Sequence, residues 1–199
     1  GGIAFVGAVV YGMAEEAKEI AEQFKATLII NDNHLVAAMV NAEGVHIGKE
    51  DVAPTDARKF LLQQIIGGTA NNLEDIKRII EVVDYIGLGP LRFTSTKKKL
   101  APILGLEGYA LLLKAMPQPK PVIAIGGISI EDIVSLMKIG VHGIAVSGGS
   151  ACQSGSSKGS HVLSEIKNQE SYTSVRFSFS RFTTIDDIKY AIQQLKKLL

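Results

Sequence analysis

The sequence has few of the features that mark secreted, membrane or nucleic-acid-binding proteins. It has one cysteine among 199 residues, so no internal disulfide can form, and this favours a reducing, cytoplasmic location. No apolar run approaches the roughly 20 residues of a membrane span, and no signal peptide is visible. The formal net charge is +1, so no strong electrostatic field favours a nucleic-acid or membrane partner.

The sequence is rich in short β-branched runs that alternate with longer segments of helical periodicity. With 46% hydrophobic residues, the chain can build one sizeable domain with a packed core. The expected strands are residues 3–12, 27–32, 44–48, 65–70, 84–89, 121–127, 143–148 and 174–180. Most are continuous apolar runs, as expected for strands covered on both faces. Eight strand–helix units predict a small (β/α)8 barrel, with an open doubly wound sheet as the competing architecture.

The helices are expected between these strands, at residues 14–26, 35–42, 72–83, 105–116 and 130–140. A further helix is expected to begin at Thr55, whose hydroxyl is a common N-cap group. The tail adds a weak helix near 160–167 and a final helix after residue 182. The Gly/Ser-rich stretch near residue 150 is too short for an interdomain linker, so residues 1–199 are expected to form a single domain.

In a parallel barrel, the residues that follow each strand gather at one end of the fold. Here they comprise carboxylates from two neighbouring strands, a Thr/Lys loop and two glycine turns. They are Asn31, Asp32, Lys49, Glu50, Asp51, Thr69, Thr94, Thr96, Lys97, Gly126, Gly127, Ser147 and Gly148. Carboxylates suit Mg²⁺, which binds substrate phosphates, and glycine turns offer backbone N–H groups to phosphate. The set predicts a small phosphorylated substrate, a diphosphate held with Mg²⁺.

Each of these segments also has an ordinary structural interpretation. The sequence "IND" is equally typical of a strand end with an Asx turn, and "TSTKKK" is typical of a solvated loop. His46 lies inside an expected strand, which favours a packed role over a catalytic one. Co-location at one end of a barrel is the reason to treat the set as a site.

Several segments resemble the thiamine phosphate synthase family, in order and spacing. They are "LIIND", "GVHIGKED", "IIGGTANN", "DYIGLGPLRFTSTKK", "LGLEG", "VIAIGGI" and "GIAVSG", over about residues 27–148. The resemblance implies a (β/α)8 barrel. It also implies a transferase that joins a hydroxymethylpyrimidine diphosphate to a thiazole phosphate and releases pyrophosphate.

The resemblance also implies a role for each matching residue. Asp32 and Asp51 would hold Mg²⁺, and Asn31 would lie beside the diphosphate. Thr69 would contact the pyrimidine or the diphosphate, and Lys97 would bind the leaving pyrophosphate. The thiazole phosphate would be held by Thr94, Thr96, Gly126, Gly127, Ser147 and Gly148.

Two parts of the chain depart from the family pattern. Residues 3–10 stand at the family's second strand, and its diphosphate-gripping Gln-x-Arg-x-Lys residues are replaced here by Gly7, Val9 and Tyr11. Residues 147–195, with "GSAC" and "VRFS", resemble the C-terminal end of cysteine desulfurases. In that family the cysteine, here Cys152, accepts sulfur, and the arginine, here Arg176, binds the substrate carboxylate.

The two patterns overlap near residue 147, so the chain looks chimeric. The strand–helix unit of the tail, residues 149–199, is expected to fill the place of the missing first unit and close the barrel. An alternative to the synthase is a folded but inactive chimera, and a second alternative is a sulfur-transfer protein that uses Cys152. No sequence feature sets the oligomeric state.

Overall fold

The strands form one parallel sheet whose spatial order is the same as their order in the chain. The computed structural model describes residues 3–6, 11–23, 26–93 and 102–145. The seven strands of its sheet are β1 (Ile3–Val6), β2 (Thr27–Asn31), β3 (Gly44–Ile47), β4 (Ile65–Ala70), β5 (Tyr85–Leu88), β6 (Val122–Ala124) and β7 (Gly143–Ile144). Each strand pairs in parallel with the next. Parallel neighbours joined by helical crossovers are the defining pattern of a (β/α) barrel.

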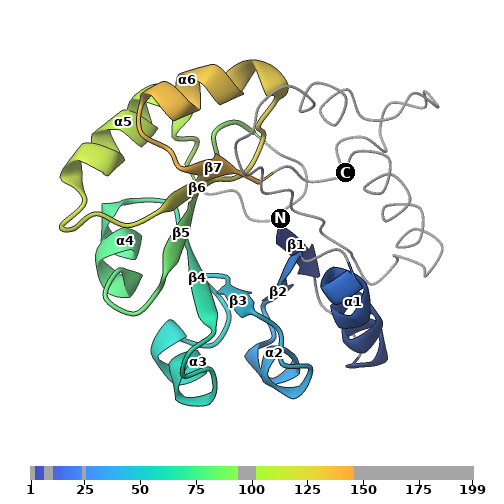
Figure 1. The fold of residues 1–199 in the computed structure, drawn as a ribbon. Helices are drawn as coiled ribbons and strands as arrows, with labels where there is room; N and C mark the ends of the chain where they lie inside the picture. Colours follow the sequence, from blue (N-terminus) through green and yellow to red (C-terminus); the bar gives the residue numbers. More distant parts are fainter. Residues whose placement is uncertain (1–2, 7–10, 24–25, 94–101, 146–199) are drawn as a thin grey trace.

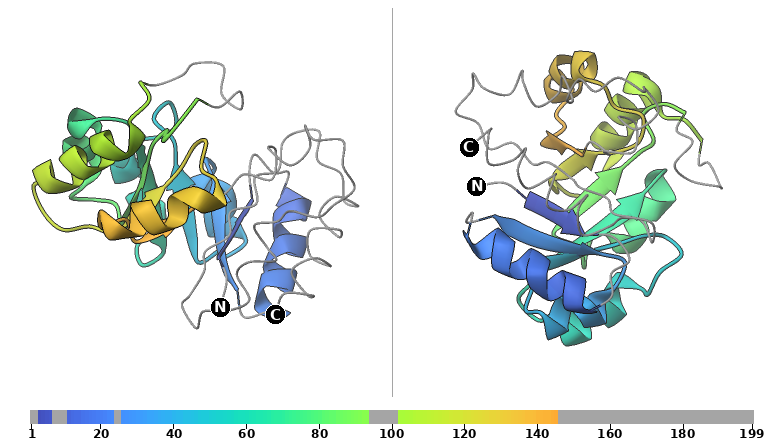
Figure 2. Two further views of the ribbon diagram at one scale, coloured as in Figure 1. Left: turned by 90° about the horizontal axis from the view of Figure 1, so that it is seen from above. Right: turned by 90° about the vertical axis from the view of Figure 1, so that its right-hand side faces the viewer.

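The helices lie outside the curved sheet, as Figures 1 and 2 show from three directions. They are α1 (Tyr11–Gln23), α2 (His34–Met39), α3 (Pro54–Phe60), α4 (Leu73–Ile79), α5 (Gly105–Ala115) and α6 (Ile133–Lys138), with a 3₁₀ helix, η1 (Ile130–Asp132), before α6. In the described part of the chain, no helix is long and apolar enough to cross a membrane.

The hydrophobic core lies between the strands and the helices. Successive side chains of a strand point to opposite faces, and one alternating set packs against the helices. This set includes Leu28, Ile30, Val45, Ile47, Ile66, Ile86 and Leu88, each at most 1% exposed and all in one buried cluster. The other set lines the barrel interior and includes Asn31, His46, Gly67, Thr69, Tyr85 and Gly87. The core therefore leaves the inner face of the sheet available for polar side chains.

The parallel α/β barrel architecture predicted from the sequence is confirmed. The expected eighth strand, residues 174–180, and the closing role of residues 149–199 lie outside the described residues. Among the strands that the structure describes, β1 and β7 form the two edges of the sheet.

Several predicted element boundaries are wrong. Of the strand expected over residues 3–12, the structure describes Ile3–Val6 as β1, residues 7–10 lie outside the described residues, and Tyr11 already belongs to α1. Helix α3 begins at Pro54 rather than after an N-cap at Thr55, and Ala53 is the N-cap residue. Proline suits the first helical turn because its φ is already helical and its missing N–H needs no partner there.

The helix expected over residues 130–140 is divided into η1 and α6. The Asp132 carboxylate accepts hydrogen bonds from the backbone N–H and the hydroxyl of Ser129. These bonds stabilise a tight turn at Ser129–Asp132, so the regular helix begins at Ile133, three residues later than expected.

Candidate active site

Two carboxylates from neighbouring strands meet above Gly48, at the carboxyl end of the sheet. Asp32 directly follows β2, and Asp51 lies three residues beyond Gly48, which follows β3. A Cβ atom placed on Gly48 would lie 2.5 Å from Asp51 Oδ2 and 3.7 Å from Asp32 Oδ1. Both carboxylates therefore lie beside Gly48 at the same end of the sheet, and a side chain at position 48 would displace that of Asp51.

The backbone at Asp32 is shaped to present its side chain at this point. Its φ is +68°, a left-handed conformation that is uncommon for residues other than glycine. Its N–H still donates to the carbonyl oxygen of His46, at 2.8 Å, which continues the pairing of β2 with β3. Backbone strain of this kind persists where the surrounding structure imposes it, and it is concentrated at functional sites.

The loop that carries Asp51 is anchored at two points. The N–H of Gly48 donates to Asp51 Oδ2 at 2.7 Å, which closes a tight turn. Lys49 forms an ion pair with Asp75 at 2.6 Å, and the Asp75 side chain is only 6% exposed. Asp75 lies in the first turn of α4, where its N–H donates to Asn72 Oδ1, so the ion pair of Lys49 ties the loop after β3 to α4.

Thr69 lies in a buried hydrogen-bonded network on the inner face of the sheet. Its Oγ1 is 2.9 Å from His46 Nε2, and His46 Nδ1 is 2.9 Å from the Tyr85 hydroxyl. His46 is 4% exposed and Thr69 is 7% exposed. The sequence interpretation of His46 as a packed residue agrees with its burial, but it missed that both ring nitrogens are hydrogen-bonded to polar side chains.

The glycine turn after β6 is clamped onto the loop after β5. Gly126 and Gly127 have φ values of +80° and +68°, and Gly126 O accepts from Leu91 N–H at 2.8 Å. A Cβ atom on Gly127 would lie 2.9 Å from Arg92 O. The close approach of the two backbones therefore requires a glycine at position 127.

A bidentate ion pair reinforces this clamp. Arg92 donates from two guanidinium nitrogens to the two carboxylate oxygens of Asp132, both at 2.5 Å. The hydrogen bonds from Arg92, opposed by burial, hold the pKa of Asp132 well below its usual range. Although Asp132 is only 5% exposed, its hydrogen bonds to Arg92 keep it ionised at neutral pH, so the ion pair fixes the loop after β5 against η1.

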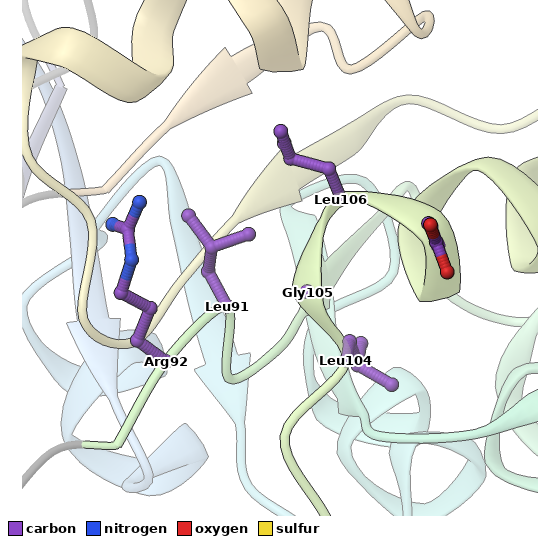
Figure 3. A pocket seen from close by; sticks show the side chains of 6 residues that line it. Leu91, Arg92, Leu104, Gly105 and Leu106 are labelled. Carbon is purple, nitrogen blue, oxygen red and sulfur yellow. The ribbon is translucent and has the colours of Figure 1, made fainter.

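An open pocket of about 350 Å³ lies where the loop after β5 meets the start of α5. Its lining residues are Leu91, Arg92, Leu104, Gly105, Leu106 and Glu107. Figure 3 shows that Leu91 and Leu106 extend to the same side of these two segments. The pocket adjoins the point where the predicted Thr/Lys loop leaves Phe93.

Asn31 is the last residue of β2, and six other predicted site residues lie outside the described residues. These are Thr94, Thr96, Lys97, Ser147, Gly148 and Cys152. The described part therefore brings together Asp32 and Asp51 and separately places Thr69 in the interior and Gly126–Gly127 at the clamped turn. Sequence reasoning missed Tyr85, Arg92 and Asp132, whose partners become visible only through strand register and loop contacts.

Comparisons with known proteins show the family to which the chain belongs. A model of the family described as thiamine monophosphate synthase matches residues 7–149. The thiamine-phosphate synthase of Flavobacterium johnsoniae is 52% identical over 141 residues, which cover 68% of this chain and 66% of the relative. That of Flavobacterium psychrophilum is 49% identical over 144 residues, covering 70% of each. The alignments thus span about two thirds of the length of these relatives.

A solved structure supports the barrel fold. The thiamine phosphate pyrophosphorylase from Pyrococcus furiosus superposes with a TM-score of 0.63, at 19% sequence identity, covering 99% of this chain and 94% of that one. The fold is that of a parallel (β/α) barrel, with Asp32 and Asp51 at the carboxyl ends of its strands. The chain belongs to the thiamine monophosphate synthase family, and its curated relatives are synthases, which are transferases.

Proposed function

We propose that this chain joins a hydroxymethylpyrimidine diphosphate to a thiazole phosphate and releases pyrophosphate. The observation that carries the proposal is the meeting of Asp32 and Asp51 above Gly48, at the strand ends where a barrel enzyme binds its substrate. The family match over residues 7–149 supports it. The substrates are small phosphorylated molecules, and the proposal includes no nucleic-acid or membrane partner. A cytoplasmic location is also proposed, on the basis of the single cysteine.

The proposed reaction needs little acid–base chemistry. The bond between the pyrimidine methylene carbon and the diphosphate oxygen breaks, and its electron pair leaves with pyrophosphate. The lone pair of the thiazole ring nitrogen then forms the new bond to the methylene carbon. Because no proton has to move, the protein contributes mainly by positioning the two substrates and by neutralising the charge of the leaving group.

The residues present fit a magnesium ion that is shared with a diphosphate. Among the described residues, no three or more His, Cys, Asp or Glu side chains cluster as a complete metal cage. Mg²⁺ does not require one, because it binds through one or two carboxylates and completes its shell with water and substrate phosphates. Asp32 and Asp51 would hold the ion. When bound, the ion would neutralise charge on the diphosphate.

Other residues of the chain are proposed to bind the substrates directly. Asn31 would lie beside the diphosphate, Thr69 would contact the pyrimidine or the diphosphate, and Lys97 would bind the leaving pyrophosphate. The second substrate's phosphate would be bound at the clamped turn. Its proposed ligands are Thr94, Thr96, Gly126, Gly127, Ser147 and Gly148.

The tail is proposed to complete the barrel within a single domain of residues 1–199. In the described part of the chain β1 and β7 are the sheet edges, and an eighth strand between them would close the sheet. Residues 174–180 are proposed as this strand. The resemblance of residues 147–195 to cysteine desulfurases, the chimeric origin and a thiol role for Cys152 remain hypotheses that the family match to residue 149 does not address.

A synthase assay tests the proposed function. The purified chain is incubated with both phosphorylated substrates and Mg²⁺, and pyrophosphate release is measured. We expect release that requires both substrates and stops when EDTA is added. Release from the diphosphate alone would indicate hydrolysis, and no release from a folded protein would favour the inactive chimera.

A further inference from the structure

We propose that His46 and Tyr85 are positioning residues that fix the Thr69 hydroxyl as a hydrogen-bond donor to the substrate. Thr69 is the residue that touches the ligand, and the other two act through it. The identity of the ligand rests on the proposed function. The direction of the hydrogen bonds within the network does not rest on the proposed function, so it can be tested separately.

The three side chains form a continuous chain inside the barrel. Both links are 2.9 Å long, from the Tyr85 hydroxyl to His46 Nδ1 and from His46 Nε2 to Thr69 Oγ1. The rings of His46 and Tyr85 are stacked, with centroids 5.5 Å apart and an interplanar angle of 27°. Because both His46 nitrogens are engaged, the imidazole cannot rotate without breaking a bond to a buried polar group, which is costly.

Two glycines create the space for this network. In the sheet register, His46 lies beside Gly67, and Gly67 lies beside Tyr85. A Cβ atom on Gly67 would lie 2.1 Å from Tyr85 Cζ, and one on Gly87 would lie 2.8 Å from His46 Cε1. His46 and Tyr85 therefore meet across a position on β4 that must lack a side chain.

The chemistry of the three groups sets the direction of the hydrogen bonds. A phenol is a much stronger acid than a neutral imidazole N–H, so Tyr85 is the better donor and His46 Nδ1 the better acceptor. The imidazole proton then lies on Nε2, which donates to Thr69 Oγ1. Because Thr69 Oγ1 accepts this bond, its own proton is available to donate outside the network. Thr69 lies near the carboxyl end of β4, so that donor is directed to the end of the barrel where substrate is proposed to bind.

The tautomer of His46 is the first test, and it needs no catalytic activity. Long-range ¹H–¹⁵N correlation spectra of the full chain distinguish a protonated from an unprotonated ring nitrogen. The sequence has four histidines, so His46→Gln assigns the signal. We expect the proton on Nε2 in the wild type and a mixture of tautomers in Tyr85→Phe. A proton found only on Nδ1 would make Thr69 donate its proton to His46 Nε2, leaving none for the substrate, and would overturn the inference even in an active enzyme.

A double-mutant cycle on kcat/KM is the second test. Tyr85→Phe is expected to lower kcat/KM about tenfold when Thr69 is present, the size of one lost hydrogen bond. In a Thr69→Val background the same change is expected to cost less than about twofold, because the group that Tyr85 orients is gone. Equal losses in both backgrounds would mean that Tyr85 only supports packing.

Neighbouring glycines provide a matched control. Gly67→Ala pushes into the Tyr85 ring, whereas a Cβ atom on Gly68 would instead meet Ile79 and Val83, on the helix side of β4. Both changes are expected to lower the melting temperature, but only Gly67→Ala should alter the His46 tautomer signal. An altered signal in Gly68→Ala of the same size would show that general loosening, not displacement of Tyr85, controls the network.

Discussion

Replacing Asp51 with asparagine separates the structural role of this side chain from its proposed role in binding. The asparagine amide oxygen can still accept the hydrogen bond from Gly48 N–H, which is 2.7 Å long in the structure. The loss is the charge assistance of one exposed hydrogen bond, about 1 kcal/mol or less. Removing one of two carboxylates that face the same point also relieves repulsion with Asp32, so the two effects oppose each other. We therefore expect the ligand-free melting temperature to change by less than about 4 °C.

The ligand-dependent part of the stability should change much more. A ligand present at 100 times its Kd stabilises the folded state by about 2.7 kcal/mol, which for a chain of this size raises the melting temperature by about 5–10 °C. A tenfold loss of affinity removes about 1.4 kcal/mol of this stabilisation. The wild type with Mg²⁺ and pyrophosphate should therefore show a rise at least twice that of Asp51→Asn.

Thermal unfolding with and without Mg²⁺ and pyrophosphate measures both quantities. Asp56→Asn is the matched control, because Asp56 pairs with Lys59 on the exposed face of α3, away from Gly48. The control should keep the full ligand-induced rise. The same rise in Asp51→Asn as in wild type would refute the assignment of Asp51 to the diphosphate and its cation.

Three further predictions follow from individual contacts. Tyr109 is fully buried, and its hydroxyl donates to Leu88 O, which also accepts from Ile125 N–H. Because Leu88 O keeps this second bond, Tyr109→Phe should lower the free energy of unfolding by only about 1 kcal/mol, or the melting temperature in calorimetry by about 2–4 °C. A loss above 10 °C would contradict this. The pKa of Asp132 is lowered in the folded state, so the ionised carboxylate stabilises the fold above the ordinary aspartate pKa of about 3.9, and this stabilisation is lost as the pH falls below that value. Asp132→Asn should therefore lower the free energy of unfolding more at pH 7 than at pH 3. An equal loss at both pH values would argue against the pairing with Arg92. Truncation after Gly149 should abolish cooperative urea unfolding if residues 174–180 close the barrel, whereas an unchanged transition would show that the tail is dispensable.

Much of the fold follows from the sequence because most of the strands are continuous apolar runs. Buried parallel strands produce apolar runs such as "TLII" and "GVHI", and both of these runs are strands within one residue of their expected limits. The meeting of Asp32 and Asp51 was also predictable, because parallel strands carry the residues that follow them to the same end of the sheet.

The interior network was not predictable from the sequence alone. His46 and Tyr85 are separated by 39 residues and by the whole of β4. Their contact depends on the register that places Gly67 between them, and a shift of one residue would turn each side chain to the opposite face. The glycines of "IIGG" and "YIG" are the sequence signal, since a glycine in a buried strand often marks a close approach.

The predicted starts of α3 and α6 were wrong for local reasons. At Pro54 the backbone preference of proline outweighed the capping tendency of Thr55. At Ser129–Asp132 the side-chain hydrogen bonds to Ser129 and the ion pair to Arg92 together fix a turn that helical periodicity does not reveal. Both errors arise where a specific contact overrides a weak average tendency.

A crystal structure of the full chain soaked with Mg²⁺, pyrophosphate and thiamine phosphate tests the placement of the site most directly. We expect pyrophosphate and a cation beside Asp32 and Asp51, and the phosphate of the product at the backbone of Gly126 and Gly127. The pyrimidine or the pyrophosphate should lie within hydrogen-bond distance of Thr69. Both anions bound away from these strand ends, in a protein that makes the product, would contradict the proposed site.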